Sequence, residues 1–93
     1  MQAGTVMTAD RSRAYTRVAK TMADLGPAKL HEIERRRIRD AADELVFATR
    51  QDHAALEALL RIRELAHQLT ASGRWTDERA ARLAADVAAC GPD

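Results

Sequence analysis

The sequence has 93 residues, enough for a single domain, and its hydrophobic content of 46% is typical of a folded protein rather than a disordered one. A net charge of +1 gives no global field that would draw the chain onto nucleic acid or an anionic membrane. No segment approaches the roughly 20 apolar residues that span a bilayer. No secretory signal pattern is visible and the single Cys90 excludes an internal disulfide framework, so we expect a cytoplasmic protein.

The first helix is predicted over residues 8–25, with Thr8 or Asp10 as its N-cap. Its apolar residues recur at intervals of three and four, which places them on one face of a helix. These residues are Tyr15, Val18, Ala19, Met22 and Leu25. Gly26 and Pro27 should end this helix, because glycine suits the left-handed position after a helix and proline suits the first turn of the next one.

Residues 28–71 contain neither glycine nor proline and have a strongly helix-forming composition. Their apolar residues keep one heptad register throughout, which favours a single helix of about 65 Å that would force a dimer. The weak helix formers of segment 49–53 favour a break instead, with Thr49 or Asp52 as the new N-cap. We favour the break, because it gives two helices of ordinary length over residues 28–48 and 52–71.

The second predicted helix carries a charged pair within its apolar stripe. The stripe consists of Leu30, Ile33, Ile38, Ala41, Leu45 and Ala48. Glu34 and Arg37 fall inside it, three residues apart, where they can pair with each other. Either this end of the stripe is exposed, or the two charges form an ion pair across a dimer interface. Val46 and Phe47 project away from the stripe, so either the helix ends near them or it offers a second apolar patch there.

The third predicted helix is apolar on two sides. Its main face consists of Ala55, Ala58, Ile62, Leu65 and Leu69. Leu56, Leu59 and Leu60 widen this face onto a flank. A helix that is apolar over more than half of its circumference usually contacts neighbours on two sides. We therefore expect this helix to be central, or to bind a second molecule.

The fourth helix is predicted over residues 77–90, with Thr76 as its N-cap and Gly73 as the residue that stops the preceding helix. Trp75 lies at the corner between the two helices. Either it covers the end of the core, or it is a surface anchor for a partner.

These elements predict an all-α fold, because no run of alternating β-branched residues indicates a strand. We expect a small antiparallel bundle of three to four helices over residues 8–93, behind a flexible tail at residues 1–7. The bundle is either complete in itself or completed by dimerisation.

Glu64 and His67 place a carboxylate and an imidazole one helical turn apart, a spacing found in helix-bundle metal sites. Glu32 is the candidate for a third ligand. Such sites need several inward-facing carboxylates, and the sequence offers only this one Glu-His pair at that spacing. A solvated glutamate beside a partly buried histidine is the favoured interpretation, and we expect no metal.

The basic run Arg35–Arg39 is the candidate for nucleic-acid binding. Successive residues of a helix rotate by about 100°, so these side chains spread around the rod instead of forming one basic face. A solvated helix with charged pairs is the favoured interpretation, and we do not expect nucleic acid as a partner on these grounds.

The sequence contains no phosphate-binding glycine loop, no zinc-ligand spacing and no nucleophile with a neighbouring base, so we expect neither enzymatic activity nor a cofactor. The leading hypothesis is a non-enzymatic helical interaction module, such as an adaptor or regulatory subunit, that binds itself or another protein. A metal-binding bundle and a DNA-associated regulator are the alternatives. The candidate interface residues are Glu34, Arg37, Val46, Phe47, Leu56, Leu60 and Trp75.

Overall fold

In the computed structural model, which describes residues 9–92, the chain folds into four α-helices joined by short loops. The all-α class and the four-helix order are as predicted. The predicted tail at residues 1–7 and the candidate N-cap Thr8 lie outside the described residues. The helices are α1 (Ala9–Ala23), α2 (Glu32–Val46), α3 (His53–Ala71) and α4 (Asp77–Ala89).

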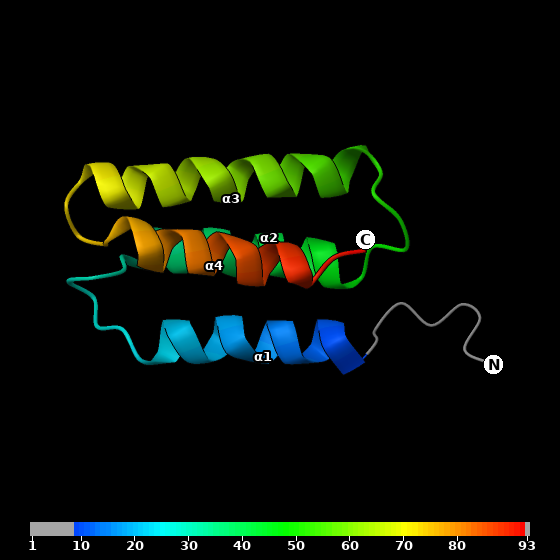
Figure 1. The fold of residues 1–93 in the computed structure, drawn as a ribbon, viewed down its shortest axis with the longest axis horizontal. Coiled ribbons are helices and arrows are strands. Elements are labelled where there is room, and N and C mark those ends of the chain that lie inside the picture. The colour runs from blue at the N-terminus through cyan, green and yellow to red at the C-terminus, as the bar shows by residue number, and fades with distance from the viewer. Residues whose placement is uncertain (1–8, 93) are drawn as a thin grey trace.

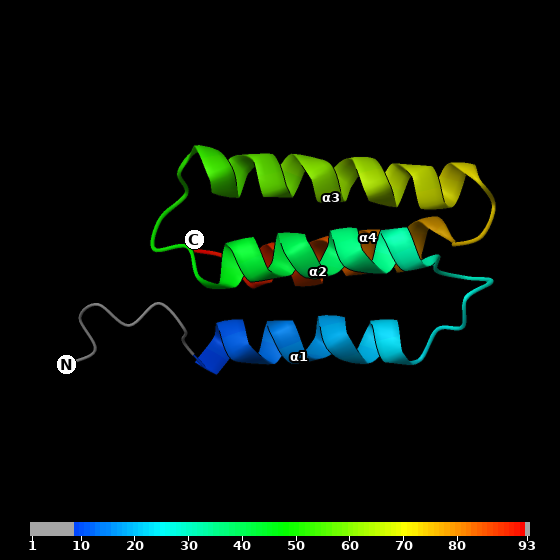
Figure 2. The same cartoon turned by 180° about the vertical axis from the view of Figure 1, so that it is seen from behind.

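Consecutive helices run antiparallel, with α1 and α3 on the two sides of the bundle and α2 and α4 between them (Figures 1 and 2). Both α1 and α3 contact α2 and α4, and α2 also touches α4. Within residues 9–92, α1 and α3 do not meet. The bundle has two ends. We call the one where α1 and α3 begin the Arg11 end, and the one where α2 and α4 begin the Trp75 end.

One hydrophobic core runs through all four helices and is built mainly from aliphatic side chains. Buried alanines on each helix let the backbones approach closely, while leucine, isoleucine and valine fill the remaining volume. Trp75 is the only aromatic side chain in the buried set of the described residues. The largest side chains with almost no exposed surface are Leu30, Ile38, Leu45, Leu69, Val18, Val46 and Val87.

The predicted break between the second and third helices is confirmed. Helix α2 ends at Val46 and α3 begins at His53, so the heptad register continues in the sequence but the chain reverses direction. Asp52 is the N-cap of α3, and its carboxylate accepts a hydrogen bond from the amide of Ala55 at 3.0 Å. This cap satisfies one of the amides that the first turn leaves without a partner. Thr76 caps α4 in the same way, as predicted.

The start of the second helix was predicted wrongly. Residues 27–30 form a turn instead of a first helical turn, and the amides of Lys29 and Leu30 both donate to the carbonyl of Gly26. This turn directs the Leu30 side chain into the core, where it has no exposed surface. Helix α2 therefore begins four residues later than predicted, at Glu32.

Two apolar residues of α2 lie on the side opposite to that predicted. Ile33 was predicted to lie in the core stripe, but its side chain is half-exposed. Ile33 and buried Ile38 are five positions apart, and at about 100° per residue their side chains point about 140° apart. Val46 was predicted to project away from the stripe, but it is buried, because α1 and α3 both pack against α2.

Gly73 has the left-handed backbone predicted for the residue after the third helix, with φ of 78°. A β-carbon there would meet no atom within 4 Å, so only backbone strain opposes a larger residue. We expect Gly73→Ala to lower the free energy of unfolding by about 1 kcal/mol in urea titrations. Gly26, predicted to be left-handed as well, has no positive φ and equally open surroundings. Gly26→Ala is therefore the control, expected to leave stability unchanged or raise it; equal losses in both variants would contradict the prediction.

Candidate functional site

Four large apolar side chains of the described residues are exposed to solvent, and two of them lie together. Leu56 and Leu60 are one helical turn apart on α3 and are 47% and 62% exposed. Phe47, 65% exposed, follows the end of α2, and Ile33 lies in the first turn of α2 near the opposite end. The leucine pair is the only one of these features that repeats at helical spacing.

Leu59 extends this pair toward the core. It is half-buried and packs against the core cluster, so that apolar surface continues from the interior to the exposed side of α3. We call Leu56, Leu59 and Leu60 the leucine face. Polar side chains lie beside it: one carboxylate oxygen of Glu57 is 3.4 Å from Nε2 of His53, and the other is 3.6 Å from a terminal nitrogen of Arg61. An apolar centre with a polar rim is the usual composition of a protein-protein interface.

Three of the predicted interface residues are buried within the bundle. Val46 and Trp75 are 1% and 5% exposed, and Glu34 is almost as deeply buried. The predicted pair between Glu34 and Arg37 does not form: Arg37 is exposed, while Glu34 binds Arg74 of the loop between α3 and α4. Of the predicted interface set, Arg37, Phe47, Leu56 and Leu60 remain on the surface.

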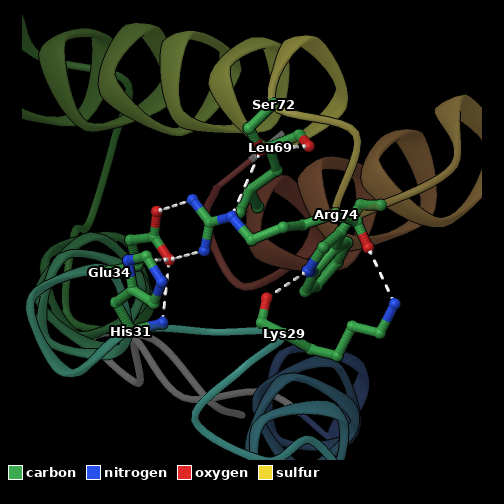
Figure 3. Close-up of polar contacts among 7 residues, drawn as sticks. Lys29, His31, Glu34, Leu69, Ser72 and Arg74 are labelled. Atoms are coloured by element: carbon green, nitrogen blue, oxygen red, sulfur yellow. Dashed lines mark hydrogen bonds and ion pairs between the residues drawn. The ribbon is translucent and has the colours of Figure 1, made fainter.

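The Glu34–Arg74 pair is a two-pronged ion pair (Figure 3). The two terminal nitrogens of Arg74 donate to the two carboxylate oxygens of Glu34 at 2.7 and 2.6 Å. The backbone amide of His31 also donates to Glu34, at 2.8 Å. The Arg74 guanidinium and this amide lower the pKa of Glu34 to about 2, although burial of the carboxylate opposes the shift.

The same cluster fastens two loops at the Trp75 end. The indole nitrogen of Trp75 donates to the carbonyl of Lys29 at 2.7 Å, which joins the loop after α3 to the loop after α1 (Figure 3). Arg74 also donates to the hydroxyl of Ser72 at 3.2 Å. Trp75 thus covers the end of the core, one of its two predicted roles. Sequence reasoning missed Arg74, although antiparallel hairpins place its loop beside the start of α2.

Arg11 holds the opposite end of the bundle together, and sequence reasoning missed it too. Its buried guanidinium donates to the carbonyl oxygens of Leu45, Ala48 and Cys90 at 2.5, 2.7 and 2.8 Å. These carbonyls belong to the ends of α2 and α4, where a helix leaves its last C=O groups without intrahelical partners. One side chain of α1 therefore caps two other helices.

The arginines of the basic run of α2 do not share one environment. Arg35 is half-buried and donates to the carbonyls of Met22 and Leu25 at the end of α1. Its charge is thus used to cap α1 within the molecule. Arg36, Arg37 and Arg39 remain exposed on α2.

The candidate metal ligands are not gathered into a site. Glu64 and His67 are both exposed on α3, and Glu32 lies in the first turn of α2. Throughout residues 9–92, no group of three or more histidine, cysteine, aspartate or glutamate side chains is placed to hold a metal ion. The one-turn spacing of Glu64 and His67 is therefore not accompanied by a third ligand.

Two hollows of opposite charge lie at opposite ends of the bundle. One, of about 650 Å³, lies between α1, α4 and the two loops of the Trp75 end, and Lys29, Arg79 and Arg82 contribute to its lining. The other, of about 570 Å³, lies beside the loop after α2, where Phe47 is surrounded by the carboxylates Asp40, Asp43, Glu44 and Asp52. We call the first the α1–α4 hollow.

No helix in the described part of the chain is long and apolar enough to cross a membrane. The chain matches no protein-family model, no curated protein and no solved structure.

Proposed function

We propose that the protein is a non-enzymatic helical interaction module that associates with a second copy of itself through the leucine face of α3. The observation that carries this proposal is the exposure of Leu56 and Leu60 at adjacent turns of one helix, in continuity with half-buried Leu59. The exposed parts of these leucine side chains contribute no hydrophobic stabilisation to the monomer, and burying them would contribute up to about 1.5 kcal/mol for each leucine. A two-fold axis would set the same face of each copy against the other.

Charge on the rim of the face fits such pairing. Glu57 and Glu64 carry negative charge and Arg61 and Arg63 carry positive charge along the exposed side of α3. When two identical helices pack antiparallel, a rim of mixed sign can place unlike charges near each other across the interface. Rim charges of this kind set orientation and partner choice more than affinity.

The test is light scattering over a concentration series with the parent and Leu60→Glu. The measured mass of the parent should rise toward twice the monomer mass as the concentration increases. Leu60→Glu should weaken association by about 100-fold. This estimate takes about 1.5 kcal/mol from Leu60 of each copy and 1.4 kcal/mol for each tenfold change. Because the Leu60 side chain is 62% exposed, the monomer should keep its circular dichroism spectrum and its melting temperature.

Ala85→Glu is the matched control, since Ala85 is an exposed residue of α4 outside the leucine face and the change adds the same charge. It should associate like the parent, while Leu56→Glu should behave like Leu60→Glu. A parent that stays monomeric at every concentration would overturn the proposal. So would a Leu60→Glu variant that associates as well as Ala85→Glu.

A further inference from the structure

The α1–α4 hollow is separate from the leucine face, because its lining comes from α1, α4 and the two loops of the Trp75 end and includes no residue of α3. Its volume of about 650 Å³ falls in the range of about 300–1,000 Å³ that is usual for small-molecule sites. A bound molecule there would leave Leu56 and Leu60 uncovered.

Cationic residues outnumber acidic ones in the lining of the hollow, four to two, and one of the four cations, Arg74, is paired with Glu34. Arg79 and Arg82 are three residues apart on α4, which places them on neighbouring turns of one helix face, and both are exposed. Neither forms an ion pair within residues 9–92. The guanidinium carbon of Arg79 lies over the Trp75 ring, 5.9 Å from its centroid. Lys29 adds a third cation from the opposite wall. Arginine forks match phosphate oxygens in geometry as well as in charge.

The two loops that line the hollow are fastened before any ligand arrives. The Trp75 indole donates to the Lys29 carbonyl, which fixes the two loops against each other (Figure 3). Arg74 also belongs to the lining, and both oxygens of Glu34 hold its guanidinium on α2. Loops that are already fixed lose little backbone entropy when a ligand binds, so the entropy cost falls mainly on the exposed Arg79 and Arg82 side chains.

Two carboxylates and an apolar floor limit the kind of anion that fits. Asp24 and Glu78 also line the hollow and would repel a ligand that is negative over its whole surface. They would accept hydrogen bonds from hydroxyl or amino groups. Buried Leu83 and half-buried Leu25 supply apolar contact between the charged side chains. A lone phosphate ion would fill only a small part of this volume.

We propose that the α1–α4 hollow binds a small phosphate ester, with the phosphate between Arg79 and Arg82 and a hydroxyl- or amino-bearing body beside Asp24 and Glu78. The two arginines supply the anion contact and Lys29 completes the positive field. The two carboxylates select esters with hydrogen-bond donors over inorganic phosphate and over extended polyanions.

The test is isothermal titration calorimetry of the full chain with adenosine monophosphate, glucose 6-phosphate and inorganic phosphate. At least one of the two esters should bind, at least tenfold more tightly than inorganic phosphate. Arg82→Glu should weaken ester binding at least tenfold, whereas Arg36→Glu, the same change at an exposed site on α2, should leave it unchanged. Both variants should keep the parent's melting temperature, because both side chains are exposed.

Glu78→Gln tests the contact with the hydroxyl- or amino-bearing part of the ester separately from the contact with its phosphate. It should reduce the preference for the ester and raise the affinity for inorganic phosphate, because a repelling charge is removed. The proposal is overturned if neither ester binds at millimolar concentration, if inorganic phosphate binds as tightly as both esters, or if Arg36→Glu weakens binding as much as Arg82→Glu. None of these outcomes depends on whether the leucine face associates.

Discussion

Replacing Arg11 with methionine is expected to lower the free energy of unfolding by about 3 kcal/mol. The buried guanidinium donates hydrogen bonds to the carbonyls of Leu45, Ala48 and Cys90. Methionine has a similar length but no donor, so these carbonyls would lose the guanidinium as their partner. The Leu45 carbonyl would keep the amide of Ala48 as a partner. A buried carbonyl left without any partner costs about 1–3 kcal/mol, which is large for a domain whose total stability is about 5–15 kcal/mol.

The measurement is urea unfolding followed by circular dichroism at neutral pH. Arg13→Met is the matched control, because Arg13 lies on the same helix and only pairs with Asp10 in an exposed ion pair. That change should alter stability by no more than about 0.5 kcal/mol. If Arg11→Met does not fold, Arg11→Lys, which retains a cationic donor, should fold with a smaller loss. Equal losses for Arg11→Met and Arg13→Met would contradict the role assigned to Arg11.

The boundaries that follow from local chemistry could be predicted from the sequence. Asp52, Gly73 and Thr76 each act on backbone groups within about three residues, as an N-cap, a left-handed glycine and a second N-cap. Such signals do not depend on what the helix later packs against. This is why segment 49–53 could be interpreted as a break although the heptad register favoured one continuous helix.

The start of α2 depends on tertiary packing, and there the prediction failed. The composition of residues 28–31 permits a helix, but the structure places Leu30 in the core from a turn. Burying this leucine contributes about 1.5–3 kcal/mol, more than the few tenths of a kcal/mol by which helix propensities differ. Whether burial of Leu30 outweighs helix propensity depends on where α3 and α4 lie, and no local sequence pattern indicates their positions.

Long-range polar contacts were the least predictable part of the candidate sites. Arg11 reaches residues 34, 37 and 79 positions away, and Arg74 reaches Glu34 across 40 positions. Both are ordinary arginines in a sequence where 31% of residues are charged, so nothing in their type or spacing distinguishes them. Their roles arise only because the antiparallel arrangement brings helix ends that are distant in the sequence close together.

The leucine face was predictable for a geometric reason. A helix that is apolar on more than half of its circumference cannot bury every apolar side chain against two neighbours. Helix α3 packs on α2 and α4 with Ile62, Leu65 and Leu69, which leaves Leu56 and Leu60 on the far side. Val46 and Trp75 do not belong to such a surplus of apolar side chains, and both are buried in the core.

Glu34→Gln is expected to destabilise the fold by about 2 kcal/mol near neutral pH and by progressively less in acid. The folded state lowers the pKa of Glu34 from its ordinary 4.5 to about 2, through Arg74 and the His31 amide. The unfolded chain therefore takes up the proton at a higher pH than the folded chain. The stabilisation from Glu34 is complete above about pH 4.5 and is lost as the pH falls through about 2.

The difference in unfolding free energy between the parent and Glu34→Gln, measured in urea at several pH values, should be largest above about pH 5 and close to zero near pH 2. Glu64→Gln is the control, because it makes the same change on an exposed side chain of α3 and should show no such closing gap. A gap that stays constant across this range would mean that the substituted glutamine side chain disturbs packing rather than charge. That result would contradict the conclusion that the Glu34–Arg74 ion pair stabilises the contact between α2 and the loop that carries Trp75.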